Sequence, residues 1–505
     1  MKTPLDRRAF LAALGSGATA SVLLRAPVLA AAADDTSGVA NDPLRPECHL
    51  MPPHNWMNDP NGPIWWKASY HLFYQLNPNA AVWGDMHWGH AISSDMIHWR
   101  HEPIALAPTP GADSEGCFSG SAVVYRGVPT FIYTGVQSAP PDLATIRDGN
   151  DKLREAQLLA IAEDDDLLHW KKLAAPVITA PPPGMRVTGF RDPCPWQEAD
   201  GWYLGVGSGE RGVGGCVLLY FSPDLREWKY LHKLAEGKPN GKPGANPVDT
   251  GEMWECPDFF QLDGRSCLFY STEGKVIWCT GDYDQRAHRF TPRQNGVLDR
   301  GAYYAPKSFL TPDGRRILWG WIRETRPEAQ YSAAGWAGVM SLPRQLRVDQ
   351  QGELQIYPTL EVDRLRSGRE ERVTLDLNTP YRLKLSTLRH EFVASTGASA
   401  SGFTVRLINN GSSVWELTVD MRGNTVHCGD ISFSLPAPPW PKPLLRLLLD
   451  ASVIESFIAG REALTSRVYT VQPGQTEIEI SVKGASSVTL SHWSLAPIST
   501  NRLTT

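Results

Sequence analysis

A short run of aromatic and aliphatic residues recurs five times in the first two thirds of the chain, at a period of about 50–70 residues. Each copy is bounded by turn residues, which is typical of a β-strand. The copies lie at residues 70–75, 130–135, 202–207, 266–271 and 316–321. A repeated unit of this length cannot bury its apolar face alone, so neighbouring units pack together. Five such units, each with several strands, predict a five-bladed β-propeller over residues 47–345.

A second element, an Asp followed four residues later by a Trp, runs in step with the first. It occurs at Asp95 and Trp99, at Asp166 and Trp170, and at Asp224 and Trp228, and a weaker copy follows at 282–290. Asp side chains accept hydrogen bonds from the backbone of a turn, and Trp is a large packing group. We expect each Asp to start a turn and each Trp to pack between blades.

The pattern of the sequence changes after about Leu346. Four segments alternate apolar with polar residues, as in a strand with one buried face, and they lie at 373–377, 403–407, 415–419 and 476–480. Such strands bury their apolar faces against a second sheet, which predicts a β-sandwich over residues 369–498. No low-complexity linker precedes it, so we expect the two modules to pack together. The predicted fold class is all-β.

The N-terminal residues are typical of an export signal. Arg7 and Arg8 precede an apolar run from Leu11 to Leu24, and four alanines follow at 30–33. Paired arginines before such a run are similar to a twin-arginine signal. Arg25 ends the run before the ~20 residues that a membrane span requires. We therefore interpret residues 1–33 as an export signal and expect a periplasmic or secreted protein that is not held in the membrane.

Composition and spacing argue against several partners. The net charge of −5, with 20% charged residues, gives no basic face for nucleic acid. The histidine pairs 87/90 and 98/101 face opposite sides of an extended chain, so we expect no metal site. A strand, rather than the helix of a dinucleotide fold, follows the glycine pattern at 207–212. The eight cysteines show no metal-type spacing, and we expect most of them to be buried and free.

Three acidic residues stand out by their sequence neighbours. Asp59 lies in an Asn-Asp-Pro-Asn-Gly segment, which predicts a tight turn whose amide donors favour the ionised carboxylate. Asp192 follows Arg191, whose charge favours ionisation. Glu255 lies between bulky residues of low polarity, which favour the protonated form of a carboxyl group. Each of the three could instead cap a turn or form a surface ion pair.

These residues also carry a resemblance to a known family. The segments are Asn55-Trp-Met-Asn-Asp-Pro-Asn-Gly62, Phe118-Ser-Gly120, Arg191-Asp-Pro193, Trp254-Glu-Cys256, Tyr304-Ala-Pro-Lys307 and Leu318-Trp-Gly-Trp321. In this order they resemble glycoside hydrolase family 32, the invertase, inulinase and levanase family. The resemblance covers nearly all of the chain after the predicted signal. It implies a five-bladed propeller with a C-terminal β-sandwich, in agreement with the repeat count.

The resemblance also implies a reaction and its residues. Asp59 would be the nucleophile, Glu255 the general acid/base, and Asp192 a transition-state stabiliser that holds fructosyl hydroxyls. The implied enzyme is a retaining hydrolase that releases terminal β-D-fructose from sucrose or from β-fructans such as levan and inulin. It forms a covalent fructosyl-enzyme and needs no metal or organic cofactor. In retaining glycosidases the two reacting carboxyl groups lie about 5–5.5 Å apart.

Supporting roles follow from the same resemblance. Asn58 and Gln75 would form hydrogen bonds with the bound fructosyl ring. Trp83 and Phe118 would form an apolar wall. Ser119 and Arg191 would contact hydroxyl groups of the sugar. The contribution of Lys307 stays open, because a Pro precedes it where the family often has a small residue.

Three alternatives remain open. A fructosyltransferase shares the first half-reaction, and a non-catalytic carbohydrate-binding propeller needs no proton donor. An inverting hydrolase would hold its carboxyl groups roughly 6.5–9.5 Å apart. The motifs do not separate sucrose, inulin and levan as substrates. A closed axial pocket admits chain ends, so we expect exo rather than endo action.

Overall fold

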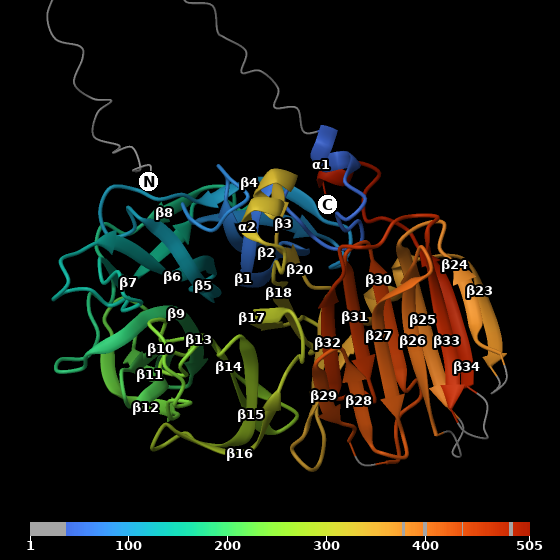
Figure 1. Ribbon diagram of the computed structural model, residues 1–505. Coiled ribbons are helices and arrows are strands. Elements are labelled where there is room, and N and C mark those ends of the chain that lie inside the picture. Colours follow the sequence, from blue (N-terminus) through green and yellow to red (C-terminus); the bar gives the residue numbers. More distant parts are fainter. Residues whose placement is uncertain (1–36, 376–378, 397–400, 437, 484–487, 505) are drawn as a thin grey trace, which may run out of the picture. The chain divides into compact units, whose positions relative to one another are not determined.

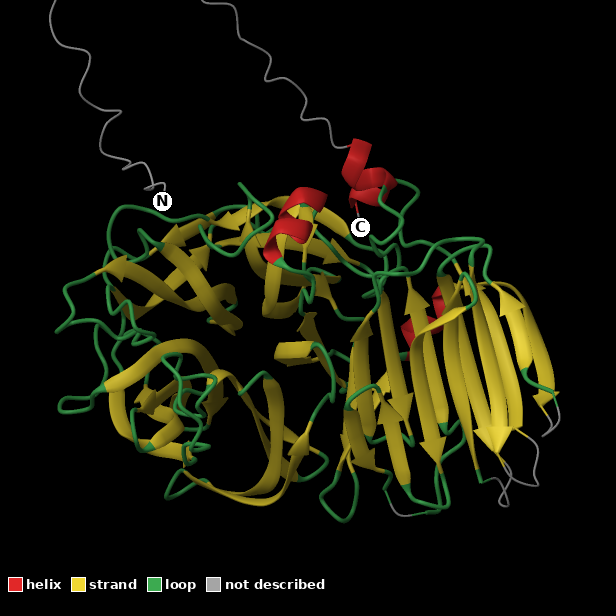
Figure 2. Ribbon diagram, in the orientation of Figure 1, coloured by secondary structure: helices red, strands yellow, loops and turns green. Residues whose placement is uncertain are grey.

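The computed structural model describes residues 37–375, 379–396, 401–436, 438–483 and 488–504, and the predicted export signal lies outside them. Strands make up nearly all of the regular structure (Figures 1 and 2). Within the described ranges the helical elements are short: α1 (Ser37–Asn41), α2 (Glu328–Ala334), and the 3₁₀ helices η2 (Leu360–Leu365) and η3 (Arg502–Thr504). The predicted all-β class is confirmed.

Five sheets form the blades of a propeller (Figure 1). Blade 1 contains β1 (Asn55–Trp66), β2 (Ser69–Asn77), β3 (His87–Ser93) and β4 (Arg100–Leu106). Blade 2 contains β5 (Gly116–Tyr125), β6 (Val128–Ser138), β7 (Leu153–Ala162) and β8 (Trp170–Lys172). Blade 3 contains β9 (Val187–Glu198), β10 (Gly201–Glu210), β11 (Gly214–Ser222) and β12 (Lys229–Glu236).

The fourth and fifth blades complete the propeller. Blade 4 contains β13 (Glu255–Leu262), β14 (Arg265–Thr272), β15 (Lys275–Asp284) and β16 (Arg289–Val297). Blade 5 contains β17 (Tyr303–Leu310), β18 (Arg316–Ile322), β20 (Val339–Met340), β21 (Arg344–Val348) and β22 (Leu354–Pro358). The five repeated segments of the sequence are β2, β6, β10, β14 and β18, the second strand of each blade. The predicted five-bladed propeller is confirmed.

The first strand of each blade lies at the centre of the propeller. The strands β1, β5, β9, β13 and β17 contact one another in this order, and β17 contacts β1. The ring is closed by β19 (Trp336–Ala337), which pairs in parallel with the start of β1 at Asn55 and Trp56. A segment far along the chain thus covers an edge of the first blade.

Each inner strand has an irregular register with its second strand. The shifts fall at residues 57–60 of β1, 118–120 of β5, 255–258 of β13 and 304–307 of β17, and in β9 they lie opposite Gly205–Gly207. Asp192, Cys256 and Ala305 in these stretches have positive φ angles of 64°, 47° and 50°. Bulges re-aim the side chains around them. Here they occur in the stretches that hold most of the predicted site residues.

The Asp–Trp elements form turns between the third and fourth strands of blades 1 to 3. In blade 1, Asp95 accepts hydrogen bonds from two backbone N–H groups of the turn, at 3.0 and 2.9 Å. The ring of Trp99 packs against Trp319 of blade 5, with 6.1 Å between centroids. The predicted structural role is confirmed for this element. In blade 2, however, Asp164 rather than the predicted Asp166 holds the turn.

Two six-stranded antiparallel sheets form the predicted β-sandwich, coloured orange to red in Figure 1. The first contains β23 (Arg366–Leu375), β34 (Val488–Leu495), β25 (Arg389–Thr396), β30 (Leu445–Asp450), β31 (Val453–Ile458) and β32 (Glu462–Arg467). The second contains β24 (Tyr381–Lys384), β33 (Thr476–Lys483), β26 (Gly402–Asn409), β27 (Ser412–Asp420), β28 (Thr425–Cys428) and β29 (Ile431–Ser434). The four predicted strands lie in β23, β26, β27 and β33, except that residues 376–377 are outside the described residues.

The propeller and the sandwich pack together through buried charges. Arg344 of β21 is fully buried and forms ion pairs with Asp299 and with Glu455 of β31. His49 lies between Asp450 and Glu455, with nitrogen–oxygen distances of 2.7 and 3.0 Å. Burial alone would lower the pKa of His49, but its hydrogen bonds to the two carboxylates raise that pKa to about 9. His49 is therefore protonated at neutral pH.

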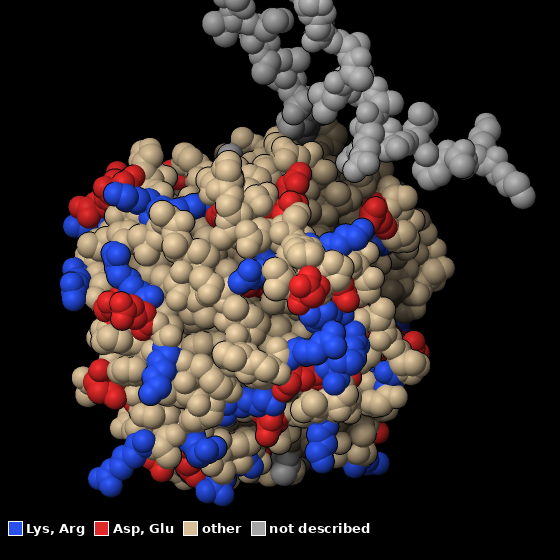
Figure 3. All heavy atoms as spheres, turned by 90° about the vertical axis from the view of Figure 1, so that its left-hand side faces the viewer, with Lys and Arg blue, Asp and Glu red and all other residues tan. Residues whose placement is uncertain are grey.

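The structure also answers the questions that the glycine pattern and the cysteines raised. A strand, β11, follows the glycine pattern at 207–212, and all eight cysteines are buried and free, as predicted. In the part of the chain that the structure describes, no helix combines the length and the hydropathy needed to cross a bilayer. Lys and Arg alternate with Asp and Glu over the face shown in Figure 3.

Candidate active site

All nine site residues predicted from the sequence line one pocket of about 400 Å³. Four blades or their loops supply them: Asn58 and Asp59 from β1, Gln75 from β2, Trp83 from the loop after β2, Phe118 and Ser119 from β5, Arg191 and Asp192 from β9, and Glu255 from β13. Most lie on different inner strands, so the closed ring brings them together.

The carboxylate of Asp59 is held by three side chains. The Asn58 amide donates to Oδ1 at 3.0 Å, and the Ser119 hydroxyl donates to Oδ2 at 2.6 Å. The Cys256 thiol lies 3.4 Å from the same Oδ2. The indole of Trp56 donates to the Asn58 side-chain oxygen at 2.7 Å, which fixes the amide with its N–H₂ toward Asp59.

The predicted tight turn around Asp59 is wrong. Residues 55–66 form the continuous strand β1, and a bulge between Met57 and Pro60 turns the carboxylate into the pocket. The donors are present, but two of the three come from other blades. Burial raises the pKa of Asp59, and the negative charge of Glu255 adds to this rise, against the lowering effect of the hydrogen bonds. The predicted effect of the donors is present, since each hydrogen bond lowers the pKa of Asp59, but burial makes the net shift upward.

Both oxygens of Glu255 are engaged by polar side chains. Arg191 donates to Oε1 from Nε at 3.2 Å and from Nη2 at 2.8 Å, and the Tyr304 hydroxyl donates to Oε2 at 2.7 Å. Trp254, one of the bulky neighbours predicted to surround this carboxyl group, points elsewhere and stacks on Tyr270, with 3.7 Å between ring centroids. Burial raises the pKa of Tyr304 far above its usual value, so its hydroxyl stays a proton donor.

Arg191 is fixed in turn by Glu155, a residue of β7 that is fully buried. Glu155 accepts from Arg191 Nη1 at 2.8 Å, from the Phe190 backbone N–H at 2.6 Å and from the Thr145 hydroxyl at 2.9 Å. A chain of hydrogen bonds therefore runs from Glu155 in blade 2 through Arg191 in blade 3 to Glu255 in blade 4 and Tyr304 in blade 5. Arg191, predicted to contact substrate hydroxyls, is mainly occupied by two carboxylates.

Asp192 lies beside Asp59 without a direct ion pair to Arg191. Its Oδ2 accepts from the Cys256 backbone N–H at 2.9 Å, and the Cys256 thiol lies 3.4 Å from it. Burial raises the pKa of Asp192 to about 7, and this effect outweighs the lowering by Arg191. The charges of Glu255 and Asp59 contribute to the rise. Arg191 thus favours the ionised form as predicted, but its effect is smaller than that of burial.

One wall of the pocket is apolar, as predicted. The rings of Trp83 and Phe118 meet edge to face, with 5.8 Å between centroids. Trp83 is 56% exposed, which leaves one of its faces available to a sugar ring. Gln75 is buried and donates to the Cys117 carbonyl oxygen at 2.9 Å.

Charged residues outside the predicted set also line the pocket. They are the exposed Asp148 and Asp249 and the half-buried Arg323. Arg323 donates to the Gly274 carbonyl oxygen at 3.0 Å and lies over the ring of Tyr304.

Sequence reasoning missed Glu155, Cys256 and Tyr304. Cys256 and Tyr304 belong to quoted motifs, but only their neighbours drew attention. Glu155 follows no motif, and its role depends on a contact between blades. Lys307, whose contribution was left open, does not line this pocket and donates to the Pro257 carbonyl oxygen at 3.0 Å.

A five-bladed propeller that gathers three carboxyl groups in one pocket and is followed by a β-sandwich suits a carbohydrate-cleaving hydrolase. Two family profiles match the chain: the N-terminal domain of glycosyl hydrolases family 32 over residues 49–358 and the C-terminal domain of that family over residues 359–494. The chain belongs to glycosyl hydrolases family 32 and is a glycosidase.

Known relatives agree with this membership. The chain is 37% identical to a sucrose-6-phosphate hydrolase of Escherichia coli, over 86% of this chain and 91% of the relative. It is 33% identical to an acid beta-fructofuranosidase of Phaseolus vulgaris, over 84% of this chain and 75% of the relative. A Bombyx mori beta-fructofuranosidase has a similar structure, with a TM-score of 0.78, 28% identity and coverage of 92% and 96%. The fructan 1-exohydrolase IIa of Cichorium intybus in complex with 1-kestose is also similar, with a TM-score of 0.73 and 27% identity. The match covers 90% of this chain and 98% of that one.

Proposed function

We propose that this glycosidase is a β-fructofuranosidase that releases terminal β-D-fructose from sucrose or β-fructans with retention of configuration. Asp59 acts as the nucleophile, Glu255 as the general acid/base, and Asp192 binds fructosyl hydroxyls. The supporting observation is that one pocket holds two carboxyl groups with different partners. Asp59 accepts from neutral donors, whereas Glu255 is held between Arg191 and Tyr304. The names of the relatives supply the sugar class.

The first step forms a covalent intermediate. The carboxylate oxygen of Asp59 attacks the anomeric carbon of the fructosyl unit while the glycosidic C–O bond breaks. The protonated carboxyl group of Glu255 gives its proton to the departing oxygen, so the leaving sugar departs as a neutral alcohol. In the second step, ionised Glu255 takes a proton from water. The water oxygen then displaces Asp59 from the anomeric carbon and releases fructose.

The proton that this cycle needs is retained by the carboxyl cluster itself. Asp59, Asp192 and Glu255 share one site, and neighbouring carboxylates cannot all ionise at low cost. The raised pKa values of Asp59 and Asp192 reflect this repulsion together with burial. Hydrolysis should therefore follow a bell-shaped pH profile whose limits belong to the cluster rather than to single residues.

Two variants and a product analysis test the proposal. Asp59→Asn and Glu255→Gln should each give a folded protein whose hydrolysis of sucrose and levan is reduced by about 10²–10⁴-fold. The anomer released first, followed by NMR, should be the β form. Near-normal turnover in either variant would remove that residue from its role, and initial release of the α form would indicate inversion.

We also propose that the substrate is an uncharged sugar rather than a sugar phosphate. A phosphate ester carries nearly two negative charges at neutral pH, and the exposed carboxylates of Asp148 and Asp249 would repel it. We expect kcat/KM for sucrose to exceed that for sucrose 6-phosphate by about tenfold or more. The double variant Asp148→Asn, Asp249→Asn should narrow this ratio, and an unchanged ratio would contradict the argument.

Fructosyl transfer remains the second candidate, because it shares the first step. A chromatographic time course at high sucrose separates the two: free fructose indicates hydrolysis, and longer oligosaccharides indicate transfer. The same time course on levan and inulin tests exo action, for which monomeric fructose should appear first.

We further propose that residues 1–33 direct export. Replacing both Arg7 and Arg8 by Lys should leave the enzyme in the cytoplasmic fraction.

A further inference from the structure

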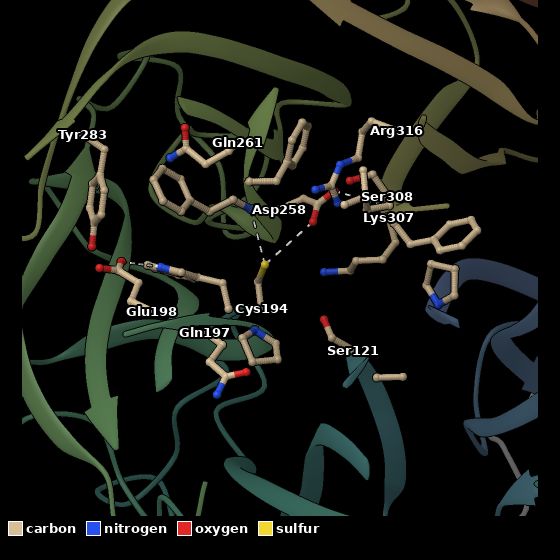
Figure 4. Close-up of a pocket in the computed structure, with 18 of the residues that line it drawn as sticks. Ser121, Cys194, Gln197, Glu198, Asp258, Gln261, Tyr283, Lys307, Ser308 and Arg316 are labelled. Carbon is tan, nitrogen blue, oxygen red and sulfur yellow. Dashed lines mark hydrogen bonds between the residues drawn. The ribbon is translucent and has the colours of Figure 1, made fainter. Parts of the chain in front are cut away.

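A second pocket, of about 420 Å³, lies further along the same inner strands (Figure 4). Its lining residues follow the site residues by two to six positions on each strand, for example Cys194 after Asp192 on β9 and Asp258 after Glu255 on β13. The proposed catalytic residues do not line it. Its walls combine aromatic residues, among them Trp196, Phe260 and Phe309, with polar ones.

Three hydrogen-bond donors at this pocket have few partners or none. Arg316 stacks over the ring of Phe260 at 4.5 Å, and its Nε has no hydrogen-bond acceptor. The hydroxyl of Ser308, a residue only 8% exposed, also has none. Buried Lys307 donates to one backbone carbonyl. Among the described residues, neither Arg316 nor Lys307 forms an ion pair within 4.0 Å. Figure 4 shows all three side chains on one side of the pocket.

The acceptors of the pocket, in contrast, are already used. Asp258 accepts from the Ser308 backbone N–H at 2.8 Å and lies 3.7 Å from the Cys194 thiol. Glu198 accepts from the Trp196 indole at 2.9 Å and from the hydroxyl of Tyr283. Buried donors are rarely left without acceptors. Asp258 acts on the charges of Arg316 and Lys307, but it forms no ion pair within 4.0 Å with either cation. The pocket therefore favours a ligand that brings negatively charged acceptor oxygens.

We propose that this pocket binds a small organic acid. Its carboxylate would accept hydrogen bonds from Arg316 and Ser308 near the charge of Lys307, and its apolar body would lie against Phe260 and Phe309. A planar guanidinium suits a carboxylate because it donates two parallel hydrogen bonds. A pocket of this size, with aromatic side chains and hydrogen-bond donors on one side, is large enough for a small-molecule ligand.

Calorimetric titration of the full-length enzyme with benzoate, and with its neutral isostere benzamide, tests the charge requirement. Benzoate should bind at least about tenfold more tightly, the effect of one charge-assisted hydrogen bond. An excess of fructose should not displace it, because fructose would occupy the other pocket. Equal binding of the two compounds, absence of binding, or displacement by fructose would overturn the proposal. Inorganic phosphate binding as tightly as benzoate would overturn the organic part of it.

Two variants test the residues. Arg316→Met keeps an unbranched side chain over Phe260 and should abolish benzoate binding, whereas Arg289→Met, at an exposed arginine of β16, should leave it unchanged. Ser308→Ala should weaken binding several-fold without a change in melting temperature, because the deleted hydroxyl has no partner in the protein. If Arg316→Met fails to fold, Ser308→Ala still decides, and unchanged affinity in that variant would refute the assignment.

Discussion

The hydrogen bonds that orient Glu255, the proposed acid/base, can be tested most directly by a change at Glu155. Replacing Glu155 by Gln preserves its shape and its possible contacts with Phe190 and Thr145, but places an uncharged group against Arg191. The change removes a charge-assisted hydrogen bond of 2.8 Å in a fully buried position. Hydrogen bonds to charged groups contribute about 1.5–3 kcal/mol. If that contribution orients Arg191 and thus Glu255 in the transition state, kcat/KM for sucrose should fall roughly 10–100-fold.

The pH dependence separates positioning from simple loss of stability. Without Glu155, Arg191 keeps Glu255 as its only carboxylate partner, and one negative charge near Glu255 is gone. Both changes favour the ionised form of the carboxyl cluster that holds Asp59, Asp192 and Glu255, so the cluster loses its proton more easily. The basic limb of the kcat/KM profile should therefore move to lower pH. A variant that is merely less stable would keep the position of that limb.

Glu252 provides a matched control. It is also buried, and it also accepts from an arginine (Arg211, 2.8 Å), a backbone N–H (Gly212, 2.7 Å) and a threonine hydroxyl (Thr250, 2.7 Å). No hydrogen bond links its carboxylate to Glu255. Glu252→Gln should lower stability by a similar amount and leave the pH profile of the remaining activity in place. If both variants behave alike, or if Glu155→Gln keeps its profile, the reasoning is refuted.

Three further predictions concern the site, the ring and the interface between modules. Tyr304→Phe removes the donor to Glu255 Oε2, so kcat/KM should fall roughly 10–100-fold while the basic limb moves to higher pH, opposite to Glu155→Gln. Gly338→Ala would place a Cβ 1.9 Å from a backbone oxygen of β1 and should cost several kcal/mol in urea unfolding, whereas Gly314→Ala, at a similar φ but in open space, should cost about 1 kcal/mol. His49 has a pKa raised from 6.5 to about 9, so its contribution to stability, on the order of 3 kcal/mol, is complete below pH 6.5 and lost as the pH rises through 9. The stability difference between wild type and His49→Gln should shrink between pH 6 and pH 9.5.

The number of blades could be predicted from the sequence because each blade repeats the same local requirement. A second strand buried on both faces needs a run of apolar residues, and the turn before the fourth strand needs an Asp and a packing Trp. These requirements act within about 60 residues, so they leave a periodic trace. The closing strand β19 leaves no such trace, because only two residues pair with β1.

The environments of the carboxyl groups could not be predicted, since they depend on contacts between blades. Sequence neighbours indicated that Asp59 and Asp192 favour ionisation, but burial and mutual repulsion raise the pKa of each. The bulky neighbours of Glu255 suggested an apolar pocket. Trp254 directly precedes β13, however, and its ring stacks on Tyr270 of β14 instead of covering the carboxyl group that follows it. Sequence proximity is a poor guide to a side chain's surroundings in a propeller.

The two carboxyl groups that are proposed to react differ in the blades that meet at each of them. Asp59 receives neutral donors from blades 1, 2 and 4, which orient it and bring no positive charge. Glu255 receives a guanidinium from blade 3 and a phenol from blade 5. The guanidinium is shared with Glu155 of blade 2, so its pull on Glu255 is weakened. The shared cation and the phenol hold both oxygens of Glu255 in place, as a group that is proposed first to donate and later to accept a proton requires.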